Sequence, residues 1–284
     1  MLSGAGKIAA VIGWPIAQSL SPALHGFWLN ELGIDGALVP LAVRREDFAT
    51  VVRGLQKAGL RGACVTLPHK EAALALCHEA DAEAKATGAA NLLIFDGGRI
   101  LARNTDAPGL AASLGEGFGA GFVHGKTAVV LGAGGAARAA LASLDHLGAA
   151  EIRVVNRSPE RAVQMVAAVA PHLSATVNVA PSFAVAAADA ALVVNTTSAG
   201  MKGAPSLALA WDALPRNAAF CDIVYNPLET GLLREARTHG HPTVDGLGML
   251  MHQAVPAFEA FFGLRPAVTP ALRRHLEEVL NARG

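Results

Sequence analysis

The stretch Thr127-Ala-Val-Val-Leu-Gly-Ala-Gly-Gly-Ala-Ala-Arg138 predicts a buried strand that runs through a glycine-rich turn into a helix. Gly132 permits a tight turn, and Gly134 lets the backbone approach a pyrophosphate closely. The helix that follows presents free N–H groups at its N-terminus, where an anion is stabilised. The stretch therefore predicts a dinucleotide site with contacts from Gly132, Ala133, Gly134, Gly135 and Ala136.

The next predicted strand, residues 151–155, ends in Asn156-Arg157-Ser158 and has no acidic residue there. An NAD site usually has Asp or Glu at this position, which accepts from the ribose 2′-hydroxyl and repels a 2′-phosphate. Arg157 instead offers a fork of donors suited to a phosphate, and the alternative is an exposed arginine at a strand end. We expect NADP as the cofactor, held by Asn156, Arg157, Ser158 and Arg161.

Four apolar runs with alanine-rich helical segments between them surround the glycine turn. Such runs are typical of parallel strands that are buried on both faces. The runs cover residues 127–131, 151–155, 191–195 and 218–224. We therefore expect residues 107–246 to form a Rossmann-like, doubly wound NADP-binding domain.

The residues up to Asp106 predict a separate α/β domain over residues 1–106. Strands are expected at 8–12, 37–43 and 62–66, and helices from Ser21, at 46–58 and at 68–77. A hairpin is expected over 91–95 and 99–102, turned by Asp96-Gly97-Gly98. Helices expected at 249–262 and 270–281 have no strand partner, so residues 247–284 should pack back on an earlier domain.

The composition favours a small-molecule partner. Lys+Arg and Asp+Glu both number 23 among 284 residues, so no broad field attracts nucleic acid or anionic lipid. The apolar run at 184–194 is short and interrupted by Asp189, and the N-terminus lacks signal-peptide features, so we expect a cytoplasmic protein without a membrane span. Cys64, Cys77 and Cys221 form no ligand spacing, which predicts neither disulfides nor a metal site.

Polar residues recur after the strands of the first domain, where α/β sheets collect ligands. Hydroxyls and amides can both donate and accept toward substrate hydroxyls, and a serine pair can hold a carboxylate. The first domain is therefore predicted to bind a polyhydroxylated acid. The residues are Ser19, Ser21, Thr66, Lys70, Asn91, Asn104, Thr105 and Asp106.

Motifs along nearly the whole chain resemble, in order, those of the shikimate dehydrogenase family. The N-terminal set is Gly13-Trp-Pro-Ile16, Ser19-Leu-Ser-Pro22 with His25, Val65-Thr-Leu-Pro68 with Lys70, Asn91, and Asn104-Thr-Asp106. After the glycine turn and Asn156-Arg157 come Asn195-Thr-Thr-Ser-Ala-Gly-Met201, Asp222-Ile-Val-Tyr-Asn-Pro227, and Gly246-Leu-Gly-Met-Leu250 with Gln253.

The resemblance implies NADP-dependent, reversible reduction of 3-dehydroshikimate to shikimate, a step of aromatic amino-acid and chorismate biosynthesis. It implies that Lys70 and Asp106 form the catalytic pair, and that the C-terminal helices return to the substrate domain. It places the substrate carboxylate at Ser19 and Ser21, and further substrate contacts at Thr66, Asn91, Asp106, Tyr225 and Gln253. It adds cofactor contacts at Thr196, Ile223 and Gly246.

The chemistry of Lys70 and Asp106 fits that role. Reduction of a ketone by hydride leaves negative charge on oxygen, which a nearby ammonium can stabilise and neutralise. Asp106 can orient this ammonium and accept from a substrate hydroxyl. Taken alone, Lys70 reads as a solvated residue in a helix's first turn, Asp106 as a helix cap and Tyr225 as a packing residue.

Three positions depart from the family pattern, and they leave the substrate open. Cys64 stands where the family usually has Asn, Leu92 where it has Thr, and Arg103 adds a cation before Asn104. The alternative is therefore a related dehydrogenase for quinate, an aminoshikimate or another ring acid. A nucleotide-sensing protein without turnover and an unrelated two-domain NADP enzyme are further alternatives, and the chain is expected as a monomer or homodimer.

Overall fold

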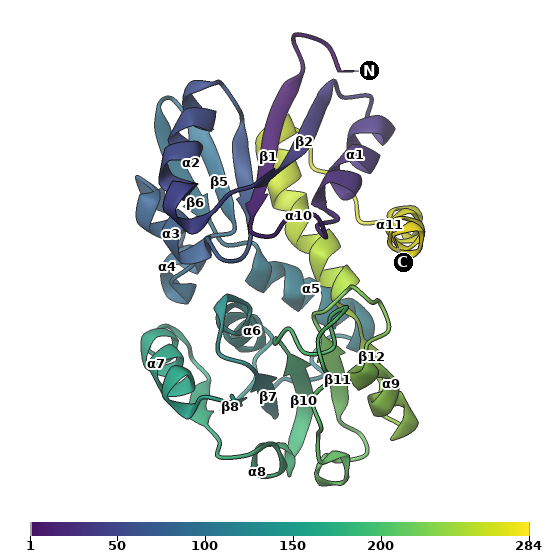
Figure 1. Cartoon of the computed structure of the whole chain (residues 1–284). Helices are drawn as coiled ribbons and strands as arrows, with labels where there is room; N and C mark the ends of the chain where they lie inside the picture. The colour runs from purple at the N-terminus through teal and green to yellow at the C-terminus, as the bar shows by residue number, and fades with distance from the viewer. Residues whose placement is uncertain (1, 284) are drawn as a thin grey trace. The chain divides into compact units, whose positions relative to one another are not determined.

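The computed structural model describes residues 2–283, which form two compact units (Figure 1). The first unit comprises the residues up to Thr105 and those from Gln253 onward, and the second runs from Asp106 to His252. The expected division placed residues 247–252 with the first domain. The structure assigns them to the second unit, because helix α10 (Gly246–Phe262) begins there and buries Met249 in that unit's core.

The first unit contains a mixed sheet of six strands in the order β2-β1-β3-β5-β6-β4. β1 pairs in parallel with β2 and β3, whereas β5 is antiparallel to both β3 and β6. The strands are β1 (Lys7–Gly13), β2 (Gly36–Ala42), β3 (Gly62–Val65), β4 (Glu79–Ala80), β5 (Leu92–Asp96) and β6 (Arg99–Arg103). The β5–β6 hairpin turns through Gly97 and Gly98, whose φ values of 53° and 82° suit glycine.

Helices cover both faces of this sheet. One face packs against α2 (Phe48–Lys57), α3 (Lys70–Leu76) and α4 (Ala82–Thr87) through an apolar cluster that includes Ile12, Val65 and Leu93. On the other face lie α1 (Ser21–Glu31), α10 and α11 (Pro270–Ala282). A short 3₁₀ turn, Arg45–Asp47, precedes α2, so the single helix expected over 46–58 is divided.

Glycines bring α10 close to the sheet. A Cβ added at Gly62 would lie 2.6 Å from Phe261 Cε1, and one at Gly36 would lie 2.9 Å from Phe262 Cε1. The C-terminal segment is also tied to the N-terminal one by polar contacts, since Lys7 Nζ donates to Phe262 O at 2.9 Å and Trp28 Nε1 donates to Ala267 O at 3.0 Å. These contacts fix α10 against β1 and β3.

The second unit contains a parallel six-stranded sheet in the order β12-β11-β10-β7-β8-β9. The strands are β7 (Thr127–Leu131), β8 (Glu151–Val155), β9 (Thr176–Val179), β10 (Ala190–Asn195), β11 (Ala219–Asp222) and β12 (Thr243–Val244). The chain proceeds outward from β7 in one direction and from β10 in the other, which makes the sheet doubly wound. The expected strand at 218–224 is shorter, because the Asp222 side chain turns the backbone there.

Helices lie on both faces of this parallel sheet, and two apolar clusters fill the layers between. The helices are α5 (Asp106–Phe118), α6 (Gly135–His146), α7 (Pro159–Val169), α8 (Phe183–Ala187) and α9 (Gly231–Thr238). This architecture confirms the expected α/β class with a Rossmann-like second part. Across residues 2–283, no helix has both the length and the apolar character needed to span a bilayer.

Candidate active site

Asn91, Thr105 and Gln253 form a hydrogen-bonded group in the first unit, which we call the Asn91 cluster. Asn91 Nδ2 donates to Thr105 Oγ1 and to Gln253 Oε1, both at 2.9 Å. Thr105 N donates to Asn91 Oδ1 at 2.8 Å, and Thr105 Oγ1 donates to Gln253 O at 2.8 Å. The structure therefore brings together Asn91, Thr105 and Gln253, which the sequence had predicted separately as substrate-site residues.

Ser19 and Ser21 lie together at the start of α1. Ser21 N donates to Ser19 Oγ at 3.3 Å, and both side chains are largely buried. The N-cap residue of α1, Leu20, offers no capping side chain, so the positive dipole end of the helix lies beside the two hydroxyls. Arg283 Nη1 anchors this turn by donating to Ser19 O at 3.1 Å. The arrangement suits a carboxylate.

Thr66 and Lys70 lie between the end of β3 and the start of α3. Thr66 N donates to Ile12 O at 2.9 Å, which extends the sheet by one residue. A Cβ at Gly13 would lie 2.5 Å from Thr66 Cγ2, so only glycine allows this approach. Lys70 O accepts from Ala90 N at 2.9 Å, which places the lysine backbone beside the residue that precedes Asn91.

The two histidines near these motifs are buried away from polar ligands. His69 Nε2 lies 2.8 Å from Val43 O, its ring stacks on Phe48, and burial lowers its pKa. His25 lies among the rings of Trp28, Phe258, Phe261 and Phe262, and burial lowers its pKa to about 3. Both environments fit packing rather than proton transfer.

Asp106 is the first residue of α5 and of the second unit, directly after Thr105 in the chain. Its side chain is only 4% exposed. Because its neighbour Thr105 is fixed twice by Asn91, the backbone leading to this carboxylate is well held.

The glycine turn of the second unit has the backbone needed for a pyrophosphate. Gly132 has a φ of +118°, and a Cβ there would lie 2.6 Å from Thr196 Oγ1, so a larger residue is strained in two ways. Thr196 Oγ1 in turn donates to Leu131 O at 2.7 Å. Gly134 is the N-cap of α6, without a side-chain cap, and a Cβ there would meet nothing within 4 Å. The open approach to unsatisfied N–H groups fits a bound phosphate.

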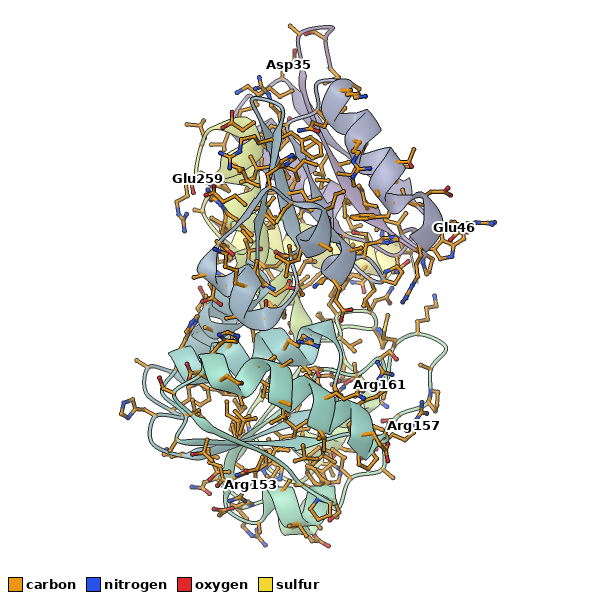
Figure 2. All side chains as sticks on the ribbon, turned by 90° about the vertical axis from the view of Figure 1, so that its left-hand side faces the viewer. Asp35, Glu46, Arg153, Arg157, Arg161 and Glu259 are labelled. Atoms are coloured by element: carbon orange, nitrogen blue, oxygen red, sulfur yellow. The ribbon has the colours of Figure 1, made fainter. Side chains whose placement is uncertain are left out.

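The predicted 2′-phosphate residues follow β8. Arg157 and Arg161 are exposed on either side of the start of α7, while Arg153 lies apart and pairs with Glu151 and Asp189 (Figure 2). Asn156 Nδ2 donates to Ser158 O at 2.8 Å, and Ser158 Oγ donates to Glu160 Oε2 at 3.1 Å. The two neutral donors are thus engaged locally, which leaves the arginines as the groups suited to a phosphate.

A buried polar network holds the loops after β10 and β11, and the sequence had not indicated it. Asp222 Oδ1 accepts from Asn195 Nδ2 at 2.9 Å, and Asp222 Oδ2 accepts from Thr230 Oγ1 at 2.7 Å. Burial raises the pKa of Asp222 despite these hydrogen bonds. Its only sequence signal is a polar residue that ends each of two apolar strands.

These loops carry the remaining predicted residues. Ile223 N donates to Asn195 O at 3.1 Å, and Gly246 N donates to Val224 O at 3.3 Å. A Cβ at Gly246 would lie 2.0 Å from Ile223 O, so glycine is required where α10 begins. Tyr225 is half-buried in the loop after β11.

The three departures from the family pattern lie in one row across the first sheet. Cys64 on β3 pairs with Leu92 on β5, which pairs with Arg103 on β6. Leu92 is fully buried between the other two. Arg103 lines a pocket together with Arg61 and Arg265, and the lining of that pocket includes no predicted substrate residue. The β6 register turns its side chain there.

The second unit has the features of an NADP-type dinucleotide-binding α/β protein: a doubly wound sheet, an open glycine turn and exposed arginines after β8. The first is a further α/β unit whose polar side chains are rich in hydroxyls and amides. The model of the shikimate dehydrogenase substrate binding domain matches residues 11–93, and that of shikimate / quinate 5-dehydrogenase matches residues 118–202. The chain belongs to the shikimate dehydrogenase family. An unrelated NADP enzyme is therefore set aside.

Relatives match over almost the full length. The chain is 48% identical to shikimate dehydrogenase (NADP(+)) of Paramagnetospirillum magneticum, over 96% of this chain and 98% of that one. It is 51% identical to the protein of the same name from Methylobacterium radiotolerans, over 93% and 94%.

Solved structures agree with this assignment. The Thermus thermophilus shikimate 5-dehydrogenase in complex with NADP(H) and shikimate has a TM-score of 0.83, 35% identity, and coverage of 97% and 99%. A quinate dehydrogenase from Corynebacterium glutamicum in complex with NAD has a TM-score of 0.86 and 29% identity at the same coverage.

Proposed function

We propose that the protein catalyses the NADP-dependent, reversible reduction of 3-dehydroshikimate to shikimate, a step in the biosynthesis of aromatic amino acids. The observation that carries the proposal is the full-length likeness to NADP-dependent shikimate dehydrogenases. The hydrogen-bonding side chains of the Asn91 cluster in the first unit are consistent with a small polyhydroxylated acid as substrate. The exposed arginines of the second unit are consistent with NADP as cofactor.

In this proposal the first unit binds the ring acid. Ser19 and Ser21 hold its carboxylate at the start of α1, where two hydroxyls lie at the positive dipole end of the helix. Thr66, Asn91 and Gln253 contact ring hydroxyls, and so does Asp106 of the second unit, where Tyr225 is a further substrate contact. Asn91 and Gln253 already bond to each other, so they can exchange that hydrogen bond for one to the ligand without a new desolvation cost.

The second unit holds NADP. Residues 132–136 contact the pyrophosphate. Arg157 and Arg161 contact the 2′-phosphate, with Asn156 and Ser158 beside them. The rest of the cofactor is contacted by Thr196, Ile223 and Gly246. When bound, NADPH supplies the hydride that reduces the ketone. Gly134 leaves room for the phosphate, and the Asp222 network fixes the loops that carry Thr196 and Ile223.

Lys70 and Asp106 are the proposed catalytic pair. As hydride reaches the ketone carbon, the Lys70 ammonium stabilises the negative charge on oxygen and transfers a proton to it, which gives the hydroxyl. Asp106 accepts from the ammonium and from a neighbouring hydroxyl, so it orients both. In the reverse direction neutral Lys70 takes the hydroxyl proton.

The test is oxidation of shikimate with NADP, followed at 340 nm, in the wild type and in Lys70→Ala. We expect turnover in the wild type and a loss of about 10²–10⁴-fold in kcat in Lys70→Ala, with NADP binding unchanged. Lys57→Ala, which removes an exposed lysine at the end of α2, serves as the control with wild-type rates. Tight NADP binding without turnover of any ring acid would support the nucleotide-sensing alternative.

A second candidate, dehydrogenation of quinate or another related ring acid, is favoured by Cys64 and Leu92, which lie next to each other in the sheet. A thiol and an apolar side chain offer fewer hydrogen bonds than the family's Asn and Thr. The same assay with quinate separates the two candidates, because a higher kcat/KM for quinate than for shikimate assigns the protein to that alternative.

A further inference from the structure

The sheet of the first unit has an open pocket of about 570 Å³ beside α10. Its floor is formed by Ile94 and Leu101, which pair across β5 and β6 and are only half-buried. Alternation along the strands puts them on the same face as Leu92 and Arg103. Pro256 of α10 forms one wall. α10 therefore covers the β3 side of this face and leaves the hairpin partly open.

Three arginines line this pocket, which we call the arginine pocket: Arg61, Arg103 and Arg265. Arg265 Nη1 lies 2.7 Å from Glu259 Oε2, so its charge is balanced; Figure 2 shows Glu259 at the margin of the first unit. Within residues 2–283, the Arg61 and Arg103 side chains form no hydrogen bond or ion pair. Asp96 is the remaining carboxylate of the lining, and the pocket carries a net positive charge.

The fold itself does not require these charges. Arg103 ends a row whose other members are Val11, Cys64 and Leu92, none of which is charged. Arg61 precedes β3, and only its backbone is bonded to the sheet. Once Arg265 is paired with Glu259, the lining holds two arginines and one carboxylate, Asp96, so one positive charge is in excess beside the apolar floor. Their placement thus points to a ligand.

We propose that the arginine pocket binds a small monocarboxylate that carries one apolar ring, at a site distinct from the Asn91 cluster and the serine pair. The planar fork of a guanidinium matches a carboxylate with two parallel hydrogen bonds. Ile94, Leu101 and Pro256 offer apolar surface to the ring. Asp96 and Glu259 disfavour a phosphate dianion, because both carboxylates would repel its second charge.

The test is isothermal titration calorimetry with benzoate, in the wild type and in Arg61→Gln and Arg103→Gln. Both residues are exposed, so the substitutions leave the core intact. We expect benzoate to bind the wild type and each substitution to weaken binding about tenfold, as loss of one charge-assisted contact does. Arg53→Gln removes the same charge from α2, outside the pocket, and should leave the affinity unchanged. Benzyl alcohol and acetate, which lack the charge or the ring, should bind more weakly than benzoate.

Three outcomes would overturn the proposal. The first is a wild type that does not bind benzoate. The second is binding that persists in the Arg61→Gln/Arg103→Gln double variant and disappears in Ser19→Ala, which would place benzoate at the serine pair. The third is a dimer in sedimentation velocity that the double variant dissociates, because the pocket would then be an interface between two copies of the chain.

Discussion

Arg157 follows β8, and its guanidinium is exposed. Its neighbours are engaged locally, since Asn156 donates to Ser158 O and Ser158 donates to Glu160. We predict that Arg157→Gln raises the KM for NADP about ten- to a hundredfold and changes the KM for NAD little. The reason is the loss of a charge-assisted contact to the 2′-phosphate, worth roughly 1.5–3 kcal/mol. Initial rates with each cofactor at saturating ring acid measure the effect.

Arg216→Gln is the matched control, because Arg216 is also exposed in the second unit but precedes β11, away from β8. Its KM for NADP should equal that of the wild type. An equal rise for NADP and NAD in Arg157→Gln would show that Arg157 does not read the 2′-phosphate.

Cys64 faces the same side of β3 as Thr66, because residues two apart on a strand share a face. We predict that Cys64→Asn, which restores the family's residue, raises kcat/KM for shikimate about tenfold by supplying a hydrogen bond to a ring hydroxyl. Cys64→Ser, with a smaller polar group, should give a smaller gain. A lower kcat/KM for shikimate in Cys64→Asn than in the wild type would contradict this assignment.

At the candidate site, residue types and their positions could be predicted from the sequence, whereas the contacts of individual side chains could not. Gly132, Gly134 and the serine pair followed from residue type and position, because glycine backbones and helix starts have few alternatives. The pocket that Arg103 lines did not, because Pro256, Glu259 and Arg265, which also line it, are distant from Arg103 in the sequence. The local hydrogen bonds that Asn156 and Ser158 donate were not predicted either, because they depend on the path of the loop between β8 and α7.

The elements themselves were well predicted where local chemistry is strong. The β5–β6 hairpin has its turn at Gly97-Gly98, and the long apolar strands β7, β8 and β10 lie within a residue of their expected bounds. β4, β9 and β12 were missed. Each is short and lies at the edge of its sheet, so its extended backbone is set by the neighbouring strand rather than by its own side chains.

The start of α10 depends on Gly246, where a Cβ would lie 2.0 Å from Ile223 O and 2.3 Å from Ile223 C. Both neighbours are backbone atoms, so they cannot turn aside. We predict that Gly246→Ala lowers the free energy of unfolding of the second unit by about 1–3 kcal/mol and weakens NADP binding, because the loop of Ile223 must shift. Denaturant unfolding and cofactor titration measure the two effects.

Gly115→Ala is the control within the same unit. Gly115 lies inside α5, and a Cβ there would meet nothing within 4 Å, so the substitution should stabilise the unit by about 0.5–1 kcal/mol. If Gly246→Ala unfolds at the same denaturant concentration as the wild type, the contact with Ile223 does not limit the start of α10.

The first unit is assembled from both ends of the chain, and no local pattern in the sequence predicts the contacts that join them. α1 contributes His25 and Trp28, and α10 contributes Phe258, Phe261 and Phe262. The return of the C-terminal helices was expected from their lack of a strand partner and from the family resemblance. That a histidine would lie at the centre of this junction depends on the packing of two distant segments.

His25 makes the stability of the first unit depend on pH. It is fully buried, and neither ring nitrogen has a hydrogen-bond partner among residues 2–283. Burial lowers its pKa from 6.5 to about 3, so below pH 6.5 the unfolded chain binds a proton that the folded unit does not. The unfolded state is favoured increasingly as the pH falls from 6.5 toward 3, by about 1.4 kcal/mol for each pH unit.

We predict that His25→Leu removes this dependence. The free energy of unfolding of the variant minus that of the wild type should be about 2 kcal/mol larger at pH 5 than at pH 7.5, because leucine takes up no proton. Leucine also fits the aromatic surroundings. Urea unfolding at the two pH values, followed through tryptophan fluorescence, to which the buried Trp28 contributes, measures the difference. Leu24→Ala, a cavity in the same helix without a titrating group, should lower stability equally at both values. If His25→Leu and the wild type change in parallel, the ring is protonated inside the folded unit, and α1 and α10 accommodate a charge between them.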